Sequence, residues 1–126
     1  MNAKQNPYLA LEKLFHEPSR LSIMSALCGA PQTGLSFNEL KALCNLTDGN
    51  LSRHLKTLQD AGAVHIRKTF IGSKPRTTLL AADMGRRGFV HYLEALEAVL
   101  KHAVDAVSAE NEGAAAVPLK SYEVKS

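Results

Sequence analysis

Residues 46–64, "LTDGNLSRHLKTLQDAGAV", have the pattern of an amphipathic helix between a polar cap and a glycine stop. Leucines recur at positions i, i+4 and i+7, which places them on one helical face at about 100° per residue. These are Leu51, Leu55 and Leu58. Thr47 is a typical N-cap and Gly62 a typical residue after a helix end. The pattern therefore predicts a helix over about 48–61 with one buried and one polar face.

A shorter helix precedes this one. Ser36 and Glu39 have the spacing of a capping box, and Leu35 and Leu40 are placed as its hydrophobic staple. Only about two helical turns fit before the next cap. Two short helices joined by a three-residue turn predict a helix-turn-helix, because Leu46 has to lie between them.

Two further helices are expected before this motif. "PYLALEKLFHEP" predicts a short amphipathic helix that ends before Pro18, and Pro18 then opens a second helix as a first-turn proline. Gly29 is the predicted stop of that second helix. Its predicted apolar face consists of Leu21, Met24, Leu27 and Cys28.

A β-hairpin is predicted over 64–81. "AVHIRKTFI" alternates as a strand does, "GSKPR" has turn chemistry, and "TTLLA" is a second run of strand formers. Lys74 and Arg76 make the tip basic. The alternative interpretation is an ordinary edge hairpin whose charges discourage aggregation.

The last predicted helix runs from about Asp83 to Ser108. It carries a heptad seam of Phe89, Leu93, Leu96, Leu100, Ala103 and Val107. At 1.5 Å per residue it is about 38 Å long, which exceeds what a small domain can cover. Part of it is therefore expected to meet a second copy. We predict one DNA-binding and dimerisation domain over 1–108, and a mobile tail over 109–126, which lacks periodicity.

Composition and charge fit this organisation. The 126 residues are 45% hydrophobic, which suits one domain, and the net charge is +3. Between Arg53 and Arg76 six basic residues face one acid, which is typical of a polyanion-binding surface. A solvated surface of mixed charge is the alternative. Cys28 and Cys44 are expected to be unpaired thiols. No membrane span or signal peptide is evident, so we expect a cytoplasmic protein without a membrane partner.

A helix-turn-helix followed by a basic-tipped hairpin is a winged helix, and it predicts a mainly α fold with a small β-hairpin. "EPSRLSIMSAL", "LTDGNLSRHLKTLQDAGAV" and "KTFIGSKPRTTLLAADMGRRGF" resemble winged-helix regulators of the ArsR/MarR type. The likeness spans roughly 14–100 and is greatest to the small branch whose wing reads "GRRPRT". The resemblance implies a homodimeric transcription regulator, with repression the expected role, that binds a pseudo-palindromic operator in double-stranded DNA.

The predicted DNA-binding residues lie on the polar face of the 48–61 helix and on the wing. They are Thr47, Gly49, Asn50, Ser52, Arg53, Lys56, Thr57, Lys74 and Arg76. Asn50 can pair with adenine and Arg53 with guanine or a phosphate, whereas Lys56 and Thr57 suit phosphates. Lys74 and Arg76 can reach the backbone or a minor groove. We expect His54 to be half-buried and to brace a neighbouring helix.

The N-terminal and last helices are predicted to form the dimer. Its predicted interface consists of Leu11, Leu14, Phe15, Phe89, Leu93, Leu96, Leu100 and Val107. We expect the dimer to hold its two copies of the 48–61 helix, the recognition helices, about 34 Å apart, which is the length of one turn of DNA.

The chain departs from the family pattern in several places. Ala81 and Ala82 replace the usual Leu-Thr, so Asp83 is the substitute cap. Cys44 alone cannot form the cysteine pair of the arsenic sensors. His91, His102 and Asp105 resemble the last-helix ligands of zinc and nickel sensors, but Phe89 replaces the first carboxylate.

We therefore predict no cofactor and treat a metal-sensing repressor as an alternative, with any small-molecule or metal effector unknown. Nucleophile-elbow, glycine-rich phosphate and metal-hydrolase spacings do not occur, so an enzyme is not expected. A winged-helix module that binds proteins rather than DNA is the other alternative.

Overall fold

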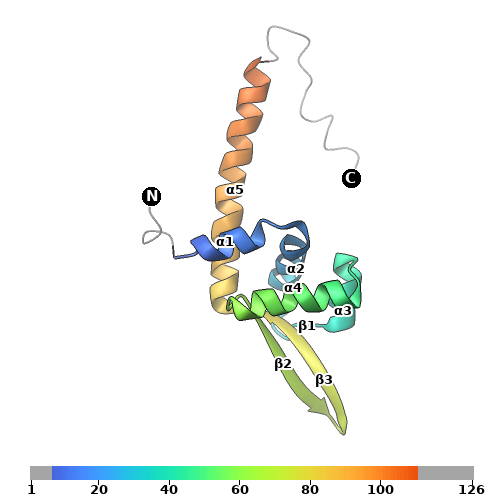
Figure 1. Cartoon of the computed structure of the whole chain (residues 1–126). Helices are drawn as coiled ribbons and strands as arrows, with labels where there is room; N and C mark the ends of the chain where they lie inside the picture. The colour runs from blue at the N-terminus through green and yellow to red at the C-terminus, as the bar shows by residue number, and fades with distance from the viewer. Residues whose placement is uncertain (1–6, 111–126) are drawn as a thin grey trace. The chain divides into compact units, whose positions relative to one another are not determined.

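The computed structural model describes residues 7–110, which contain five helices and three strands (Figure 1). The elements are α1 Leu9–Phe15, α2 Pro18–Gly29, β1 Leu35–Ser36, α3 Phe37–Cys44, α4 Asp48–Asp60, β2 Val64–Ile71, β3 Lys74–Ala81 and α5 Asp83–Glu110. The chain divides into two compact units, with the boundary between Tyr92 and Leu93. The predicted fold, mainly α with a winged helix-turn-helix, is confirmed.

The helix starts follow the predicted capping chemistry. Ser36 Oγ accepts a hydrogen bond from the Glu39 N–H at 3.1 Å, and the Ser36 N–H donates to the Glu39 carboxylate at 2.8 Å. Thr47 Oγ1 accepts the Asn50 N–H at 3.2 Å and so caps α4. Pro18 opens α2, as expected. These bonds satisfy backbone donors that a helix start otherwise leaves unpaired.

The sheet has one more strand than the sequence predicted. Its order is β1-β3-β2, and β1 pairs with β3 through Leu35 opposite Leu79. The prediction of a five-residue turn "GSKPR" is wrong in its length. Lys74, Pro75 and Arg76 belong to β3, so the turn is only Gly72 and Ser73, because the pairing of β2 with β3 continues to the last pair, Ile71 with Lys74. Gly72 has φ +63°, a backbone conformation that residues with a side chain rarely adopt.

The core of residues 7–92 lies where α1, α2, α4 and the first turns of α5 meet the base of the sheet. Phe15 and Phe89 are fully buried and pack edge to face, with ring centroids 5.3 Å apart. The predicted apolar face of α2 was only partly right. Ile23, Met24 and Leu27 are buried, whereas Leu21 and Cys28 are half-buried.

The start of α5 differs from the expected cap. Asp83 is the first helical residue, and the first turn closes through a hydrogen bond from the Arg86 N–H to the Ala82 carbonyl at 2.8 Å. Gly85 packs directly on the backbone of Ala63, and a Cβ at Gly85 would collide with the Ala63 carbonyl. Ala63, the residue before β2, is therefore in direct contact with the backbone of α5, which only a glycine at position 85 permits.

The segment of α5 from Leu93 to Glu110 carries exposed apolar side chains. Leu93, Val99, Leu100 and Val107 are 41%, 63%, 56% and 59% exposed. Ala109 and Glu110, assigned to a tail by the sequence, are helical, and the rest of that predicted tail lies outside the described residues. No helix within residues 7–110 is long and apolar enough to cross a membrane.

Part of the predicted dimer interface is not available on the surface. Leu11, Phe15 and Phe89 are at most 3% exposed because they fill the core of their own chain. The heptad seam is therefore shared between two tasks. Its first residue, Phe89, packs inside the chain, whereas Leu93, Leu100 and Val107 are exposed.

Candidate nucleic-acid interface

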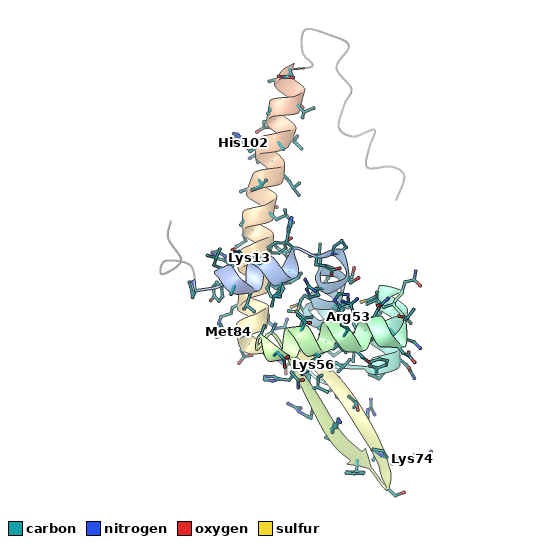
Figure 2. All side chains as sticks on the ribbon, in the orientation of Figure 1. Lys13, Arg53, Lys56, Lys74, Met84 and His102 are labelled. Atoms are coloured by element: carbon teal, nitrogen blue, oxygen red, sulfur yellow. The ribbon has the colours of Figure 1, made fainter. Side chains whose placement is uncertain are left out.

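The two faces of α4 are sharply different, as the leucine spacing predicted. Leu51, Leu55 and Leu58 are 0–3% exposed, while Asn50, Ser52, Arg53 and Lys56 are exposed. Figure 2 shows Arg53 and Lys56 on α4 and Lys74 near the end of the hairpin. The buried stripe anchors α4 in the core and leaves the polar face free for another molecule.

A buried histidine joins α4 to α2 and α1. His54 is 4% exposed, and its Nδ1 lies 3.2 Å from Arg20 Nη1. Arg20 Nε also donates to the Leu14 carbonyl at 2.7 Å. Burial lowers the pKa of His54; Glu17 opposes this, and Arg53 and Arg20 add to the lowering. The prediction that His54 braces a neighbouring helix is confirmed, although the ring is more deeply buried than expected.

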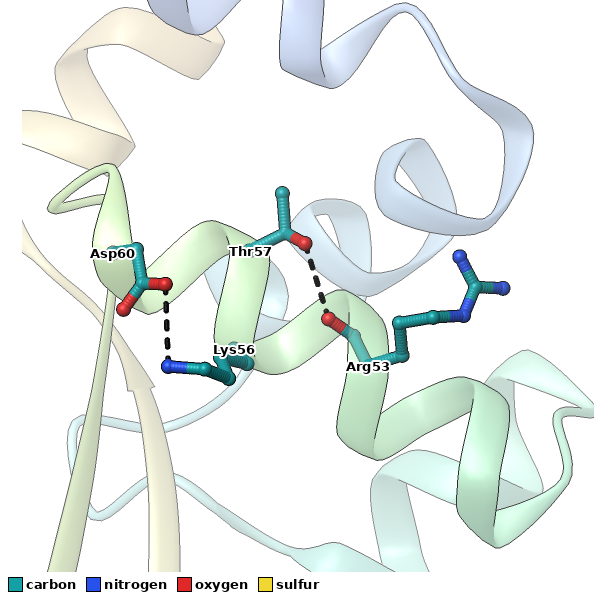
Figure 3. A network of polar contacts seen from close by, with 4 residues as sticks. All are labelled: Arg53, Lys56, Thr57 and Asp60. Atoms are coloured by element: carbon teal, nitrogen blue, oxygen red, sulfur yellow. Dashed lines mark hydrogen bonds and ion pairs between the residues drawn. The ribbon is translucent and has the colours of Figure 1, made fainter.

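Polar contacts along α4 already order its outer side chains (Figure 3). Thr57 Oγ1 donates to the Arg53 carbonyl at 3.1 Å, and Lys56 Nζ lies 3.3 Å from Asp60 Oδ2. Arg53 Nη2 donates to Asn50 Oδ1 at 3.3 Å. Asp60 therefore partly neutralises Lys56, whereas Arg53 has no carboxylate partner among the described residues.

The first turn of α4 is open. Nothing lies within 4 Å of a Cβ built on Gly49, and Thr47, Gly49 and Asn50 are all exposed. Asp48 forms an ion pair with Lys41 of α3 at 2.7 Å. A helix start with small, exposed residues lets another molecule approach its backbone closely.

A groove separates α4 from the sheet. It is lined by Phe37, Ser52, Leu55, Lys56, Gln59, Ile66, Thr77 and Leu79. Ser52 and Lys56 thus share one surface with the base of the wing. The helix face and the hairpin can contact one rod-shaped partner together.

The wing carries the other predicted contacts. Lys74 and Arg76 are exposed and lie on β3, opposite Ile71 and Thr69 of β2. Hydrogen bonds from Ser36 lower the pKa of Glu39, and the positive charge of Arg76 lowers it further. The hairpin extends past the helices α2–α4 (Figure 1). It therefore places its two basic side chains at some distance along the surface from α4.

Sequence reasoning missed an apolar feature of the wing. Phe70 is 72% and Ile71 is 58% exposed. The sequence pattern places them on opposite faces of a strand and does not say whether either face is covered. The hairpin continues beyond the helices that bury Val64, so neither residue has a core to pack on. Strand periodicity alone does not say where a sheet leaves its core.

The structure places all nine predicted DNA-binding residues at the surface. Eight are exposed and Thr57 is half-buried, since its hydroxyl bonds to the backbone of α4. Seven lie on α4 or its cap, and two lie on β3. Their contact with DNA remains a prediction.

The alternative metal ligands do not form a cluster within one chain. Among residues 7–110, no group of three or more His, Cys, Asp or Glu side chains is placed to hold a metal ion. His91 Nδ1 instead lies 2.7 Å from Glu12 Oε1.

Comparison with known sequences identifies similar proteins. The family described as "Winged helix DNA-binding domain" matches residues 19–100. "Uncharacterized protein MJ0432" of Methanocaldococcus jannaschii is 37% identical over 81 residues, which cover 64% of this chain and 86% of that protein. The matched family is defined by DNA binding rather than by catalysis, which confirms the expectation that the chain is not an enzyme.

Solved structures share the fold. The transcriptional regulator homologue from Pyrococcus horikoshii OT3 is 29% identical, with a TM-score of 0.65, and the match covers 77% of this chain and 97% of that one. MepR of Staphylococcus aureus in its DNA complex is 17% identical, with a TM-score of 0.57 and coverage of 87% and 80%. A MarR-family regulator from Silicibacter pomeroyi is 18% identical, with a TM-score of 0.55 and coverage of 89% and 75%. The last two likenesses show the fold alone.

Proposed function

The chain belongs to the winged helix DNA-binding domain family, and on that premise we propose that it is a homodimeric transcriptional regulator of the MarR type. It binds a pseudo-palindromic operator in double-stranded DNA and represses transcription by occupying it. The recognition helix α4 enters the major groove, and the hairpin of β2 and β3 contacts the backbone or the adjacent minor groove.

The supporting observation is the exposed polar face of α4 beside the basic wing. Arg53 is exposed, and among residues 7–110 its guanidinium is paired only with the neutral amide of Asn50. A charged group held by a neutral one is ready to exchange that bond for a stronger one to a base edge or a phosphate. The excess of five positive charges between Arg53 and Arg76 supplies the attraction to a polyanion.

The residues of α4 differ in which part of the DNA they can contact. Gly49 and Ser52 allow the helix to approach the groove, and Asn50 and Arg53 carry the bidentate groups that read adenine and guanine. Lys56 and Thr57 contact phosphates, which set the register of the helix. Thr47 belongs to the same edge, since its hydroxyl oxygen is already ordered by capping.

The dimer is formed by the apolar residues that the chain leaves exposed. On α5 the proposed residues are the exposed Leu93, Leu100 and Val107 and the half-buried Leu96, and the half-buried Leu14 contributes from α1. An apolar stripe of this length on a helix normally meets another helix. A two-fold dimer then matches an operator whose half-sites lie about 34 Å apart.

Binding of the purified protein to random duplex DNA, selected at two salt concentrations, tests the proposal. We expect a palindrome to be enriched and its affinity to fall steeply with salt. On that palindrome, Arg53→Ala should lose about 1–3 kcal/mol and relax the preference at one position. Lys74→Ala should weaken binding to all sequences alike and reduce the salt slope by about one.

Lys13→Ala is the matched control, because Lys13 is exposed on α1 and lies outside the proposed DNA-binding surface. It should bind the palindrome as the parent does. Binding that is weak and indifferent to sequence would remove the proposal of a specific operator. If Arg53→Ala and Lys74→Ala both bind like Lys13→Ala, the contact assignments are wrong.

A further inference from the structure

The tip of the wing, residues 70–75, presents large apolar side chains to solvent. Phe70 is 72% exposed and Ile71 is 58% exposed. Pro75 is also exposed and lies directly opposite Phe70 on β3. The hairpin extends past the helices that form the core, so the fold does not bury these side chains (Figure 1). They are available to a partner that can remove them from water.

Strand alternation places Phe70 on the same face of the sheet as the groove beside α4. Ile66 of β2 and Leu79 of β3 line that groove and are paired across the two strands. Phe70 follows Ile66 by four residues on β2, so the two side chains point to the same face. Phe70 therefore extends, toward the tip, the surface that contains Ser52 and Lys56 of α4.

The charge of the hairpin around this tip is entirely positive. Residues 64–81 contain four lysine and arginine side chains and no acidic one. None of the four forms an ion pair within residues 7–110. They are Arg67, Lys68, Lys74 and Arg76. Apolar side chains among cations suit a partner with an anionic surface and an apolar interior, and DNA, with stacked bases between two phosphate backbones, is such a partner.

The length of the wing is similar to the spacing between neighbouring grooves of DNA. The four residues from Ile66 to Phe70 span about 13 Å, at about 3.3 Å per residue. Half a turn of DNA, which separates a major groove from the next minor groove, is roughly 17 Å. With α4 in a major groove, the tip and the Phe70 side chain can therefore reach the minor groove beside it.

The backbone around Phe70 is stiff. The turn contains only Gly72 and Ser73, and Pro75 fixes its own φ angle on the strand opposite Phe70. A side chain on a stiff hairpin loses less conformational freedom when it is inserted into a partner. Apolar side chains inserted between base pairs from the minor groove partly unstack them and bend the duplex. We propose that Phe70 is such a wedge, and that it inserts into the minor groove next to the major groove occupied by α4.

This inference rests on the proposed function and adds a residue that selects operators by their shape. Pyrimidine–purine steps, TA and CA/TG, are unstacked and bent most easily, whereas A-tracts are stiff. The wedge therefore predicts a TA or CA/TG step about half a turn outside each contact of α4. Specificity at that step comes from the cost of bending and needs no hydrogen bond to a base.

Fluorescence of 2-aminopurine, which rises when this base is unstacked, tests the proposal. The full-length protein is added to a duplex that carries the selected palindrome, with 2-aminopurine in place of one adenine at a time. The parent should raise the fluorescence at the predicted step, and should bind about tenfold less tightly when that step is changed to AA. Phe70→Thr keeps a β-branched strand former and removes the ring. It should give no rise, bind about tenfold less tightly than the parent, and be indifferent to the change of step.

Ile71→Thr is the matched control, because Ile71 is the neighbouring exposed apolar residue and alternation turns it to the opposite face. It should keep the fluorescence rise and keep the affinity within about twofold. Phe70→Leu should also keep the rise, because leucine is an apolar wedge too. Both threonine variants should melt as the parent does, since both positions are exposed. Binding to vesicles of phosphatidylglycerol and phosphatidylcholine is measured in parallel, because an apolar tip among cations also suits an anionic membrane.

Four results would overturn the proposal. They are no fluorescence rise when the parent is bound to its palindrome, the same rise with Phe70→Thr, equal losses of affinity in the two threonine variants, or vesicle binding that depends on Phe70 while DNA binding does not. In each of these cases the parent still binds its palindrome, so the proposed function stands without the wedge. A parent that selects no palindrome would remove the proposed function and this inference together.

Discussion

Arg20 and His54 form a contact that fixes the protonation state of a buried ring. Arg20 Nη1 lies 3.2 Å from His54 Nδ1, and the histidine is 4% exposed. A guanidinium can only donate, so Nδ1 accepts and the ring is neutral with its proton on Nε2. Because Arg20 also binds the Leu14 carbonyl, this contact joins α1, α2 and the recognition helix α4.

The neutral ring predicts a pH-dependent stability. Burial lowers the pKa of His54 in the folded chain, so below its ordinary value of 6.5 the unfolded chain binds a proton that the folded chain does not. The stabilising contribution is complete above that value and is lost as pH falls from 6.5 to the folded pKa. Urea unfolding at pH 7.5, 6.5 and 5.5 should therefore show a falling free energy of unfolding.

His54→Gln separates this effect from other titrations. It should lower the free energy of unfolding at pH 7.5, and its stability should depend less on pH between 7.5 and 5.5. His65→Gln is the control, because His65 is exposed on β2 and should keep the pH dependence of the parent. An unchanged pH dependence in His54→Gln would show that the ring does not control it.

Features governed by local chemistry could be predicted from the sequence. The capping box of Ser36 and Glu39, the cap at Thr47 and the leucine stripe of α4 each depend on residues within one or two helical turns. The polar face of α4 follows from the same spacing. The hairpin was also predicted, because the alternation of its residues is a local pattern. Only the predicted turn was longer than the observed one.

Features governed by distant contacts were missed. β1 has only two residues, and its pairing with Leu79 joins segments far apart in the chain. The sequence shows Gly85 as a helical glycine, but not that Ala63 lies against it. Phe89 begins the heptad seam, yet its ring packs on Phe15 of the same chain. A periodic pattern shows which residues share a face and not which partner covers each of them.

Gly85→Ala should destabilise the chain severely. The added Cβ would collide with the Ala63 backbone, and backbone cannot give way as a flexible side chain does. We expect a loss of about 3 kcal/mol or more in the free energy of unfolding, at the upper end for overpacked cores. Gly29→Ala, where nothing lies within 4 Å, should lose nothing or gain up to about 1 kcal/mol. Equal stability of the two variants in urea would disprove the close packing of α5 on Ala63.

Gly49→Ala should have opposite effects on stability and on DNA binding. Gly49 is helical and has open space around it, so alanine should stabilise the fold by about 0.4–1 kcal/mol. In the proposed complex the major groove of DNA lies close to the backbone of Gly49. An alanine side chain would stand in the way, so operator affinity should fall by about 1 kcal/mol or more. Thermal unfolding and operator titration measure the two effects. A stabilised variant with unchanged affinity would place Gly49 outside the interface.

Asp60→Asn should tighten DNA binding. The change removes a negative charge from the outer face of α4 and frees Lys56 Nζ, which lies 3.3 Å from Asp60 in the free protein. The salt slope of binding should steepen by about one, and stability should change by no more than about 0.5 kcal/mol because the pair is exposed. Asp105→Asn on α5 makes the same change of charge outside the proposed interface. A rise in affinity of equal size in both variants would reflect net charge and not Lys56.

The exposed apolar stripe of α5 predicts that Leu100 is needed for dimerisation. Leu100 is 56% exposed on the heptad seam, and Leu100→Glu would place a charge within the proposed interface. Light scattering should show a dimer for the parent and a monomer for this variant, with palindrome affinity reduced and half-site affinity kept. Val99→Glu introduces the same charge at a 63% exposed neighbour outside the seam and should remain dimeric. A monomeric parent, or dissociation of both variants alike, would mean that this stripe is not the interface.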